Sequence, residues 1–284
     1  MLPFLQLVEK WSMLTFLVSS MLAMGLQLSL LQICDGLRNI RFVLVALFLN
    51  FVFAPAFAWL ITVTIPLDQG YAVGLLLLGG AAGAPFLPRL VQIARGDLAR
   101  AASLMVLLTA VTILFLPFAL PVFVRQAQAD PWQIAKPLLV LIVLPLVVGI
   151  TVKCLASVPA AKAAPILGFI GNASLFLFFI LLVALNFRVI LDVIGTGAIV
   201  AAVLYILGLL GAGWLLGGSN FKERGVMALA AAARNFGAAL VPASSLQDPK
   251  ISVMLIVCAI AALVVSFFAA AWMGRQGEKG VASA

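Results

Sequence analysis

Histidine is absent from this 284-residue chain, and charged residues make up only 9% of it. The missing histidine excludes a Cys/His metal site and any catalytic pair that uses a histidine base. The scarcity of charge excludes a water-soluble domain, because such domains carry about a quarter charged residues. Cys34, Cys154 and Cys258 form no CxxC pair and are predicted to be inert thiols. We therefore expect no metal site, no cofactor, no catalytic residue and no enzyme activity.

Apolar residues dominate what is present: 65% of the chain is hydrophobic and the mean hydropathy is +1.26. In lipid, only helices and closed barrels satisfy every backbone polar group. The apolar runs are about twice as long as a barrel strand, so they predict helices. The formal charge of +8 is not gathered into a basic cluster, which argues against nucleic acid. The predicted fold class is an all-α polytopic membrane protein with lipid around it.

The hydropathy pattern predicts nine transmembrane helices in a single domain, residues 1–284, with approximate halves 12–125 and 136–274. Alternate loops collect most of the Lys and Arg residues, which makes that side cytoplasmic. The protein is thus expected in the cell membrane with its N-terminus outside and its C-terminus in the cytoplasm. The predicted spans are 12–33, 42–64, 71–94, 99–124, 136–157, 164–186, 189–217, 223–244 and 250–274.

Glycine and proline interrupt the third predicted span. Proline removes a backbone donor and clashes with the preceding turn, so closely spaced prolines after glycines predict local unwinding. Unwound backbone at membrane depth is tolerated only where it lines a cavity or packs in protein. The interrupting residues are Gly79, Gly80, Gly83, Pro85 and Pro88.

The eighth predicted span carries a second interruption, Arg234-Asn235-Phe236-Gly237. Paired interrupted spans in corresponding halves of a chain indicate a transporter binding site between inverted repeats. The alternative is that glycine and proline are simply common in membrane helices.

Two arginines, Arg89 and Arg234, fall in or beside the interrupted spans, and no carboxylate is predicted at mid-span to pair with them. Intramembrane charges are functional by default. A guanidinium is a planar donor fork suited to carboxylate, sulfonate or phosphate. We hypothesise that both arginines approach one central site and act as tethered cations for an organic anion. The alternative is that each side chain snorkels to the interface.

Other polar side chains in the spans are further candidates for the binding site. Thr109 and Thr112 lie three residues apart on one helical face, and Asn50 and Asn172 lie in other spans. For the hydroxyls, a hydrogen bond back to the helix's own carbonyl is the competing role.

Five segments together resemble the bile acid:sodium symporter family, and the resemblance covers nearly the whole chain. It implies a core domain with two crossed, unwound helices, a panel domain, and alternating access between them. The segments are MLAMGLQLSL at 21–30, Asn50-Phe51-Val52 with Pro55, GAPFLPRLVQIARGDLA at 83–99, TAVTILFLP at 109–117 and ARNFGAAL at 233–240.

The resemblance also implies sodium sites, but this chain departs from the family pattern at several of their positions. The family's Glu is Ala230, its Gln is Arg234, and its Ser-Asn pair is Leu87-Pro88. The family's Gln in the second helix is Asn50, whereas Thr109 and Asn235 are retained. A hard cation needs several oxygen ligands, and a fixed positive charge in a low-dielectric site repels it.

The predicted function is therefore secondary transport of an organic anion, of bile acid, carboxylate or sulfonate type, by alternating access. The substitutions argue against sodium coupling. The alternatives are a sodium-coupled symporter of the family with a non-standard site, and an anion channel. The oligomeric state and the direction of transport stay open.

Overall fold

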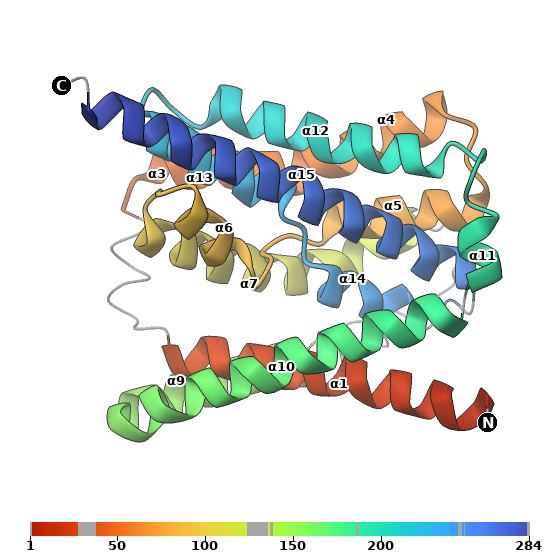
Figure 1. Ribbon diagram of the computed structural model, residues 1–284, viewed down its shortest axis with the longest axis horizontal. Helices are drawn as coiled ribbons and strands as arrows, with labels where there is room; N and C mark the ends of the chain where they lie inside the picture. Colours follow the sequence, from red (N-terminus) through yellow and green to blue (C-terminus); the bar gives the residue numbers. More distant parts are fainter. Residues whose placement is uncertain are drawn as a thin grey trace.

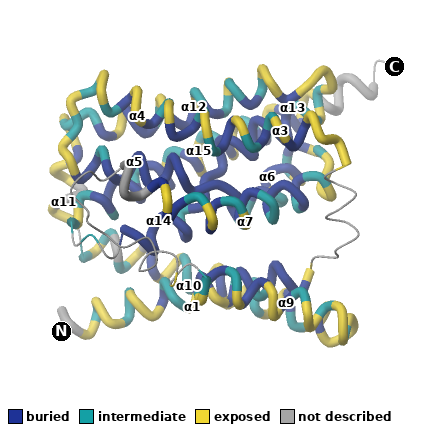
Figure 2. Tube along the Cα trace, turned by 180° about the vertical axis from the view of Figure 1, so that it is seen from behind, coloured by how far each residue is buried: buried dark blue, intermediate teal, exposed yellow. Residues whose placement is uncertain are grey.

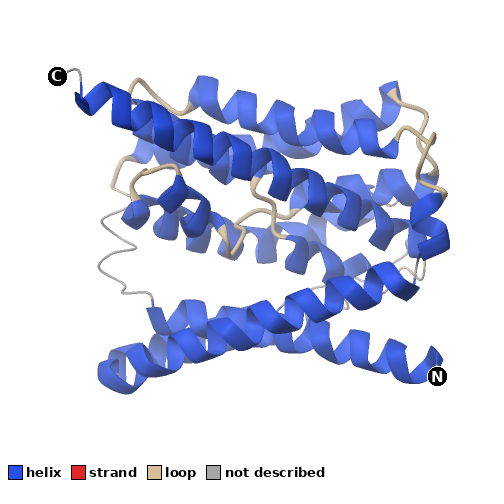
Figure 3. Cartoon of the chain, viewed as in Figure 1, coloured by secondary structure: helices blue, strands red, loops and turns tan. Residues whose placement is uncertain are grey.

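The computed structural model describes residues 2–27, 38–123, 136, 139–185, 187–243, 246 and 248–282. Every regular element in these ranges is a helix, which confirms the all-α fold class for the described part of the chain. Figure 3 shows helices joined by short loops. Such a structure satisfies the backbone within each segment, as a lipid environment requires.

A small group of helices forms one layer of the molecule. Helix α1 packs against both α9 and α10, and the π-helical turn η2 leads directly into α9. Figure 1 shows α1, α9 and α10 together below the remaining helices. The bounds are α1 Leu2–Gln27, η2 Leu139–Val143, α9 Leu144–Leu155 and α10 Ser157–Leu185.

The remaining helices form a larger body above this layer (Figure 1). Within it α12 packs on α13 and α15, α5 packs on α4, α14 and α15, and α6 packs on α7. The elements are α3 Ile40–Phe48, η1 Leu49–Phe53, α4 Ala54–Thr64, α5 Gln69–Gly80, α6 Leu87–Ile93, α7 Leu98–Phe123, α11 Phe187–Leu191, α12 Ala198–Leu216, α13 Phe221–Ala232, α14 Phe236–Ala243 and α15 Pro249–Ala282.

Seven segments of the described chain are long and apolar enough to cross a membrane, so this is a multi-pass membrane protein. Two shorter apolar helices, Gln69–Gly80 and Leu139–Leu155, add to them. The first span differs from the predicted 12–33, because α1 already begins at Leu2. Glu9 and Lys10 lie within this helix, with Lys10 exposed. A charged group near a helix end reaches the interface on its own stem, so it need not end the helix. Residues 28–33 of that prediction lie outside the described residues.

Burial identifies the centre of the larger body. In an apolar 18-residue stretch of Phe221–Ala243, the segment that contains α13 and α14, 94% of the residues are buried, whereas the corresponding share in Ser157–Leu185 is only 19%. Figure 2 shows the same contrast between the interior of the larger body and α10. The second interrupted segment is therefore enclosed by its neighbours, and α10 presents most of its surface outward.

Ion pairs in the described part of the chain lie near helix ends. Lys250 Nζ is 2.6 Å from Asp68 Oδ2, beside the start of α5, and Arg100 pairs with Glu223 near the starts of α7 and α13. The Lys250 hydrogen bond and the Gly70 N–H lower the pKa of Asp68 below its ordinary value. The buried Arg234 is the exception to this distribution of charge.

Candidate functional site

The chain leaves helical geometry between Gly80, which ends α5, and Leu87, which begins α6. Gly83 in this gap has φ +80°. A Cβ on Gly83 would lie 2.4 Å from the backbone nitrogen of Thr109. Only glycine fits a left-handed conformation this close to another backbone. Gly83 is therefore needed for the backbone conformation of this non-helical segment, which we call the first break.

Two threonines of α7 bind the backbone of this break. Thr112 Oγ1 accepts from the N–H of Ala82 (2.8 Å) and lies 3.0 Å from the carbonyl oxygen of Ala82. Thr109 Oγ1 is 2.9 Å from the carbonyl oxygen of Gly83 and 2.7 Å from that of its own helix residue Met105. Both hydroxyls are fully buried. They hold unwound backbone that would otherwise be unsatisfied in a buried position.

The second break joins α13, which ends at Ala232, to α14, which begins at Phe236. The Asn235 backbone N–H donates to the carbonyl of Ala81 (3.1 Å), and its Nδ2 donates to that of Gly83 (3.1 Å). Asn235 Oδ1 accepts from the N–H of Ala238 (3.0 Å), as an N-cap of α14 does. The two breaks are thus hydrogen-bonded to each other.

Arg234 is fully buried and also takes part in the hydrogen bonds around the two breaks. We call this set of hydrogen bonds the network. Its Nε donates to the carbonyl of Leu78 (3.1 Å), its Nη2 to that of Gly79 (2.7 Å), and its Nη1 to Asn50 Oδ1 (2.6 Å). The two carbonyls belong to the last turn of α5, where helix carbonyls lack intrahelical partners and the dipole is negative. A guanidinium is therefore stabilised there without a carboxylate.

Asn50 is placed for this contact by the π-helical turn η1. Such turns are rare in proteins, and those that occur are often found at functional sites. Asn50 Nδ2 donates to the carbonyl of Ala46 (2.9 Å), which leaves Oδ1 as the acceptor for the guanidinium. Within the described residues, Arg234 is bound only by neutral oxygens, and no ion pair involves it.

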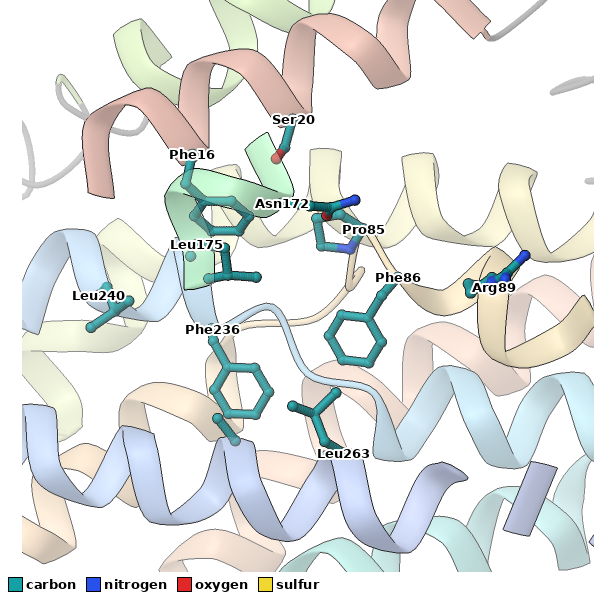
Figure 4. A pocket seen from close by; sticks show the side chains of 12 residues that line it. Phe16, Ser20, Pro85, Phe86, Arg89, Asn172, Leu175, Phe236, Leu240 and Leu263 are labelled. Carbon is teal, nitrogen blue, oxygen red and sulfur yellow. The ribbon is translucent and has the colours of Figure 1, made fainter. Parts of the chain in front are cut away.

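Two adjoining cavities lie between the small layer and the larger body, with volumes of about 500 and 680 Å³. Helices α1 and α10 supply one wall, and α6, α14, α15 and the first break supply the other. Figure 4 shows the first cavity. The residues common to both linings are Ser20, Pro85, Arg89 and Asn172.

The two cavities differ in character. The first is bordered by the aromatic rings of Phe16, Phe86 and Phe236 and by leucines. The second includes the amides of Gln27 and Gln92. Among the described lining residues of both, Arg89 alone carries a charge. The space therefore combines an apolar, aromatic part with one positively charged side chain.

The family model described as "Sodium Bile acid symporter family" matches residues 14–193, more than half of the chain. The chain belongs to the sodium bile acid symporter family. This confirms the resemblance on which the sequence analysis relied. The matched residues include the first break but end before α12, so Arg234 and the second break lie beyond them. A comparison with curated proteins gave no match.

The structure does not bring the two arginines of this family member to one site, contrary to the hypothesis of a shared central site. Arg234 has no exposed surface, whereas Arg89 is exposed in the cavities and donates to Gln92 Oε1 (2.7 Å). The separation has a physical cause: the carbonyls of Leu78 and Gly79 at the end of α5, together with Asn50, accept the hydrogen bonds of Arg234 inside the larger body. Arg89 lies in the first turn of α6, where its side chain lines both cavities.

The other predicted residues divide between the network and the cavities. Asn50, Thr109, Thr112 and Asn235 belong to the network, while Pro88 lines the larger cavity and Pro85 both. Gly79 allows α5 to approach Ala58, and Gly80 ends α5. Gly237 lines the smaller cavity, and a Cβ there would lie 2.7 Å from Leu17.

Sequence reasoning missed the contribution of α1 and of Gln92 to the cavities. Ser20 lies in an apolar run with no glycine or proline break, so nothing marked it. Gln92 follows Arg89 by three residues, a spacing that places two side chains on one helical face, and this signal was available.

Gly83→Ala is expected to destabilise the protein by about 2–4 kcal/mol, because the new Cβ overlaps the backbone of Thr109 and the positive φ is strained. The thermal midpoint in detergent measures this. Gly211→Ala is the matched control, since a Cβ on Gly211, within α12, meets nothing within 4 Å. Equal midpoints for the two variants would contradict the geometry of the first break.

Proposed function

We propose that this protein is a secondary transporter of organic anions that have an apolar body, such as bile acid-like carboxylates and sulfonates. The observation that carries the proposal is the pair of cavities between the two layers, with Arg89 as their charged group among apolar and aromatic side chains. A single guanidinium suits one carboxylate or sulfonate. Alternating access follows if the layer of α1, α9 and α10 and the larger body move relative to each other around this site.

Sodium-independent transport is the second part of the proposal. The guanidinium of Arg234 lies among two carbonyl oxygens and one amide oxygen, the kind of ligand set that a hard cation prefers. A sodium ion added there would compete for the same oxygens and be repelled by a fixed positive charge. Arg234 thus supplies permanently the charge that a bound cation would supply in each cycle.

The proposed topology counts nine spans, with α5–α6 and α13–α14 each forming one interrupted span. The halves 12–125 and 136–274 are inverted repeats, the N-terminus is outside and the C-terminus cytoplasmic. The larger cavity is lined by Gln27 at the end of α1 and by Leu98 and Ala99 at the start of α7. On this topology those helix ends lie toward the cytoplasm, so the cavity is reached from inside.

The test is uptake by purified protein in liposomes, with cholate and taurocholate as anions and an uncharged sterol as comparison. We expect saturable anion uptake, stimulated by the same anion loaded inside, at equal rates in sodium and choline buffers. A sodium requirement would contradict the second part of the proposal. Flux that never saturates would favour a channel, and the absence of uptake for a wide set of carboxylates and sulfonates would overturn transport of this class.

A further inference from the structure

Two polar side chains of the small layer line the cavities, opposite the larger body. Ser20 belongs to α1 and Asn172 to α10, and both line both cavities, as Arg89 does from α6. The Ser20 hydroxyl also lies against α10, since a Cβ on Gly171 would be 2.5 Å from Ser20 Oγ. Ser20 and Asn172 are therefore neighbours where α1 and α10 pack together (Figure 4).

Their hydrogen bonding differs from that of three hydroxyl residues of the same layer. Ser12 and Ser19 in α1, and Thr151 in α9, each donate to the carbonyl four residues earlier. Ser20 and Asn172 make no hydrogen bond to any residue that the structure describes. A polar group at membrane depth without a partner is costly, and such groups are retained where they serve a function.

We propose that Ser20 and Asn172 bind the anionic head group of the substrate together with Arg89. The Ser20 hydroxyl offers one donor, the Asn172 amide two, and Arg89 keeps donors beyond the one given to Gln92. The inference rests on the proposed function and refines it. A carboxylate or sulfonate then accepts hydrogen bonds from both layers, so the bound head group bridges the two layers.

This arrangement also limits the charge of the substrate. Ser20 and Asn172 are neutral, so the site provides one positive charge for the head group. The adjoining space beside Phe16 and Phe236 is apolar and would leave a second negative charge unpaired. The substrate class is therefore a monoanion, and dianions of the same shape are poor substrates.

Cysteine labelling tests the placement without any knowledge of the substrate. In full-length protein with Cys34, Cys154 and Cys258 replaced by serine, Ser20→Cys and Asn172→Cys are treated with methanethiosulfonates bearing a sulfonate or a trimethylammonium group. After correction for intrinsic reactivity, we expect the anionic reagent to react about fivefold faster at both positions. Adding Arg89→Gln should abolish the preference. Ser174→Cys is the control, because Ser174, also in α10, lies outside both linings.

Unreactive cysteines at 20 and 172, or equal rates for the two reagents, would overturn the inference. The labelling result can be interpreted even if the proposed function is wrong, because the labelling reaction requires no transport. For an anion with saturable uptake, Asn172→Ala should raise KM about tenfold, since a hydrogen bond to a charged group is lost. Ser12→Ala, whose hydroxyl bonds within α1, should leave KM unchanged. An unchanged KM for both variants would contradict the role of Asn172.

Discussion

Arg234→Ala is expected to lower the thermal midpoint by about 10 °C. The change removes three donors from buried oxygens of Leu78, Gly79 and Asn50. The Leu78 carbonyl still accepts from the Ala81 N–H, whereas the Gly79 carbonyl and Asn50 Oδ1 keep no other donor among the described residues. Each buried acceptor left without a partner costs about 1–3 kcal/mol. In a chain of this size each kcal/mol shifts the midpoint by about 2–4 °C. Thermal unfolding in detergent measures the loss.

The same variant tests whether Arg234 stands in for a bound cation. Without the guanidinium no fixed positive charge faces the three oxygens, so they can bind sodium, and sodium should raise the midpoint of Arg234→Ala relative to choline. The parent protein should show the same midpoint in both salts. Arg234→Lys should recover only part of the stability, because an ammonium lacks the planar fork that reaches three acceptors. A parent protein that is itself stabilised specifically by sodium would refute the interpretation.

Arg89→Gln is expected to reduce kcat/KM for anion uptake about 50-fold while the thermal midpoint stays within a degree or two of the parent. The guanidinium is exposed in the cavities and donates to one side chain, Gln92, so its loss leaves little unsatisfied. A charge-assisted hydrogen bond to the substrate is worth about 1.5–3 kcal/mol, which corresponds to this loss of rate. Initial uptake rates in liposomes provide the measurement.

Arg188→Gln is the matched control for this experiment. Arg188 is an exposed arginine of α11 and lines neither cavity. Its replacement should change neither uptake nor the thermal midpoint. If Arg89→Gln transported as well as Arg188→Gln, the anion site would have to lie elsewhere.

The location of both breaks was predictable because it depends on local chemistry. Gly83 and Pro85 disfavour a helix wherever they occur, and the Arg234-Asn235 pair places strong hydrogen-bonding groups inside an apolar run. The structure leaves helical geometry at these residues. The family was also predictable, because its motifs are short segments in a fixed order.

The partners of the two arginines were not predictable from the sequence. Arg234 and Leu78 are 156 residues apart, and their contact depends on how α5 and α13 pack. The sequence predicts no carboxylate at mid-span for either arginine, but it does not predict that Arg234 binds helix-end carbonyls or that Arg89 lines a cavity. The contribution of Ser20 to the cavities was not predictable for the same reason. The packing of α1 on α9 and α10 determines which face of α1 lines the cavities.

The oxygen shell around Arg234 has an electrical consequence. In the proposed sodium-independent cycle, the charge of Arg234 returns with the empty carrier, so only the charge of the substrate crosses the membrane over a complete cycle. A monoanion moving alone is subject to the membrane potential, worth about 2.3 kcal/mol per 100 mV. At an interior-negative potential of about 100 mV this favours efflux of the monoanion by about 50-fold. Unless it exchanges one anion for another, such a carrier would empty the cell of its substrate rather than accumulate it.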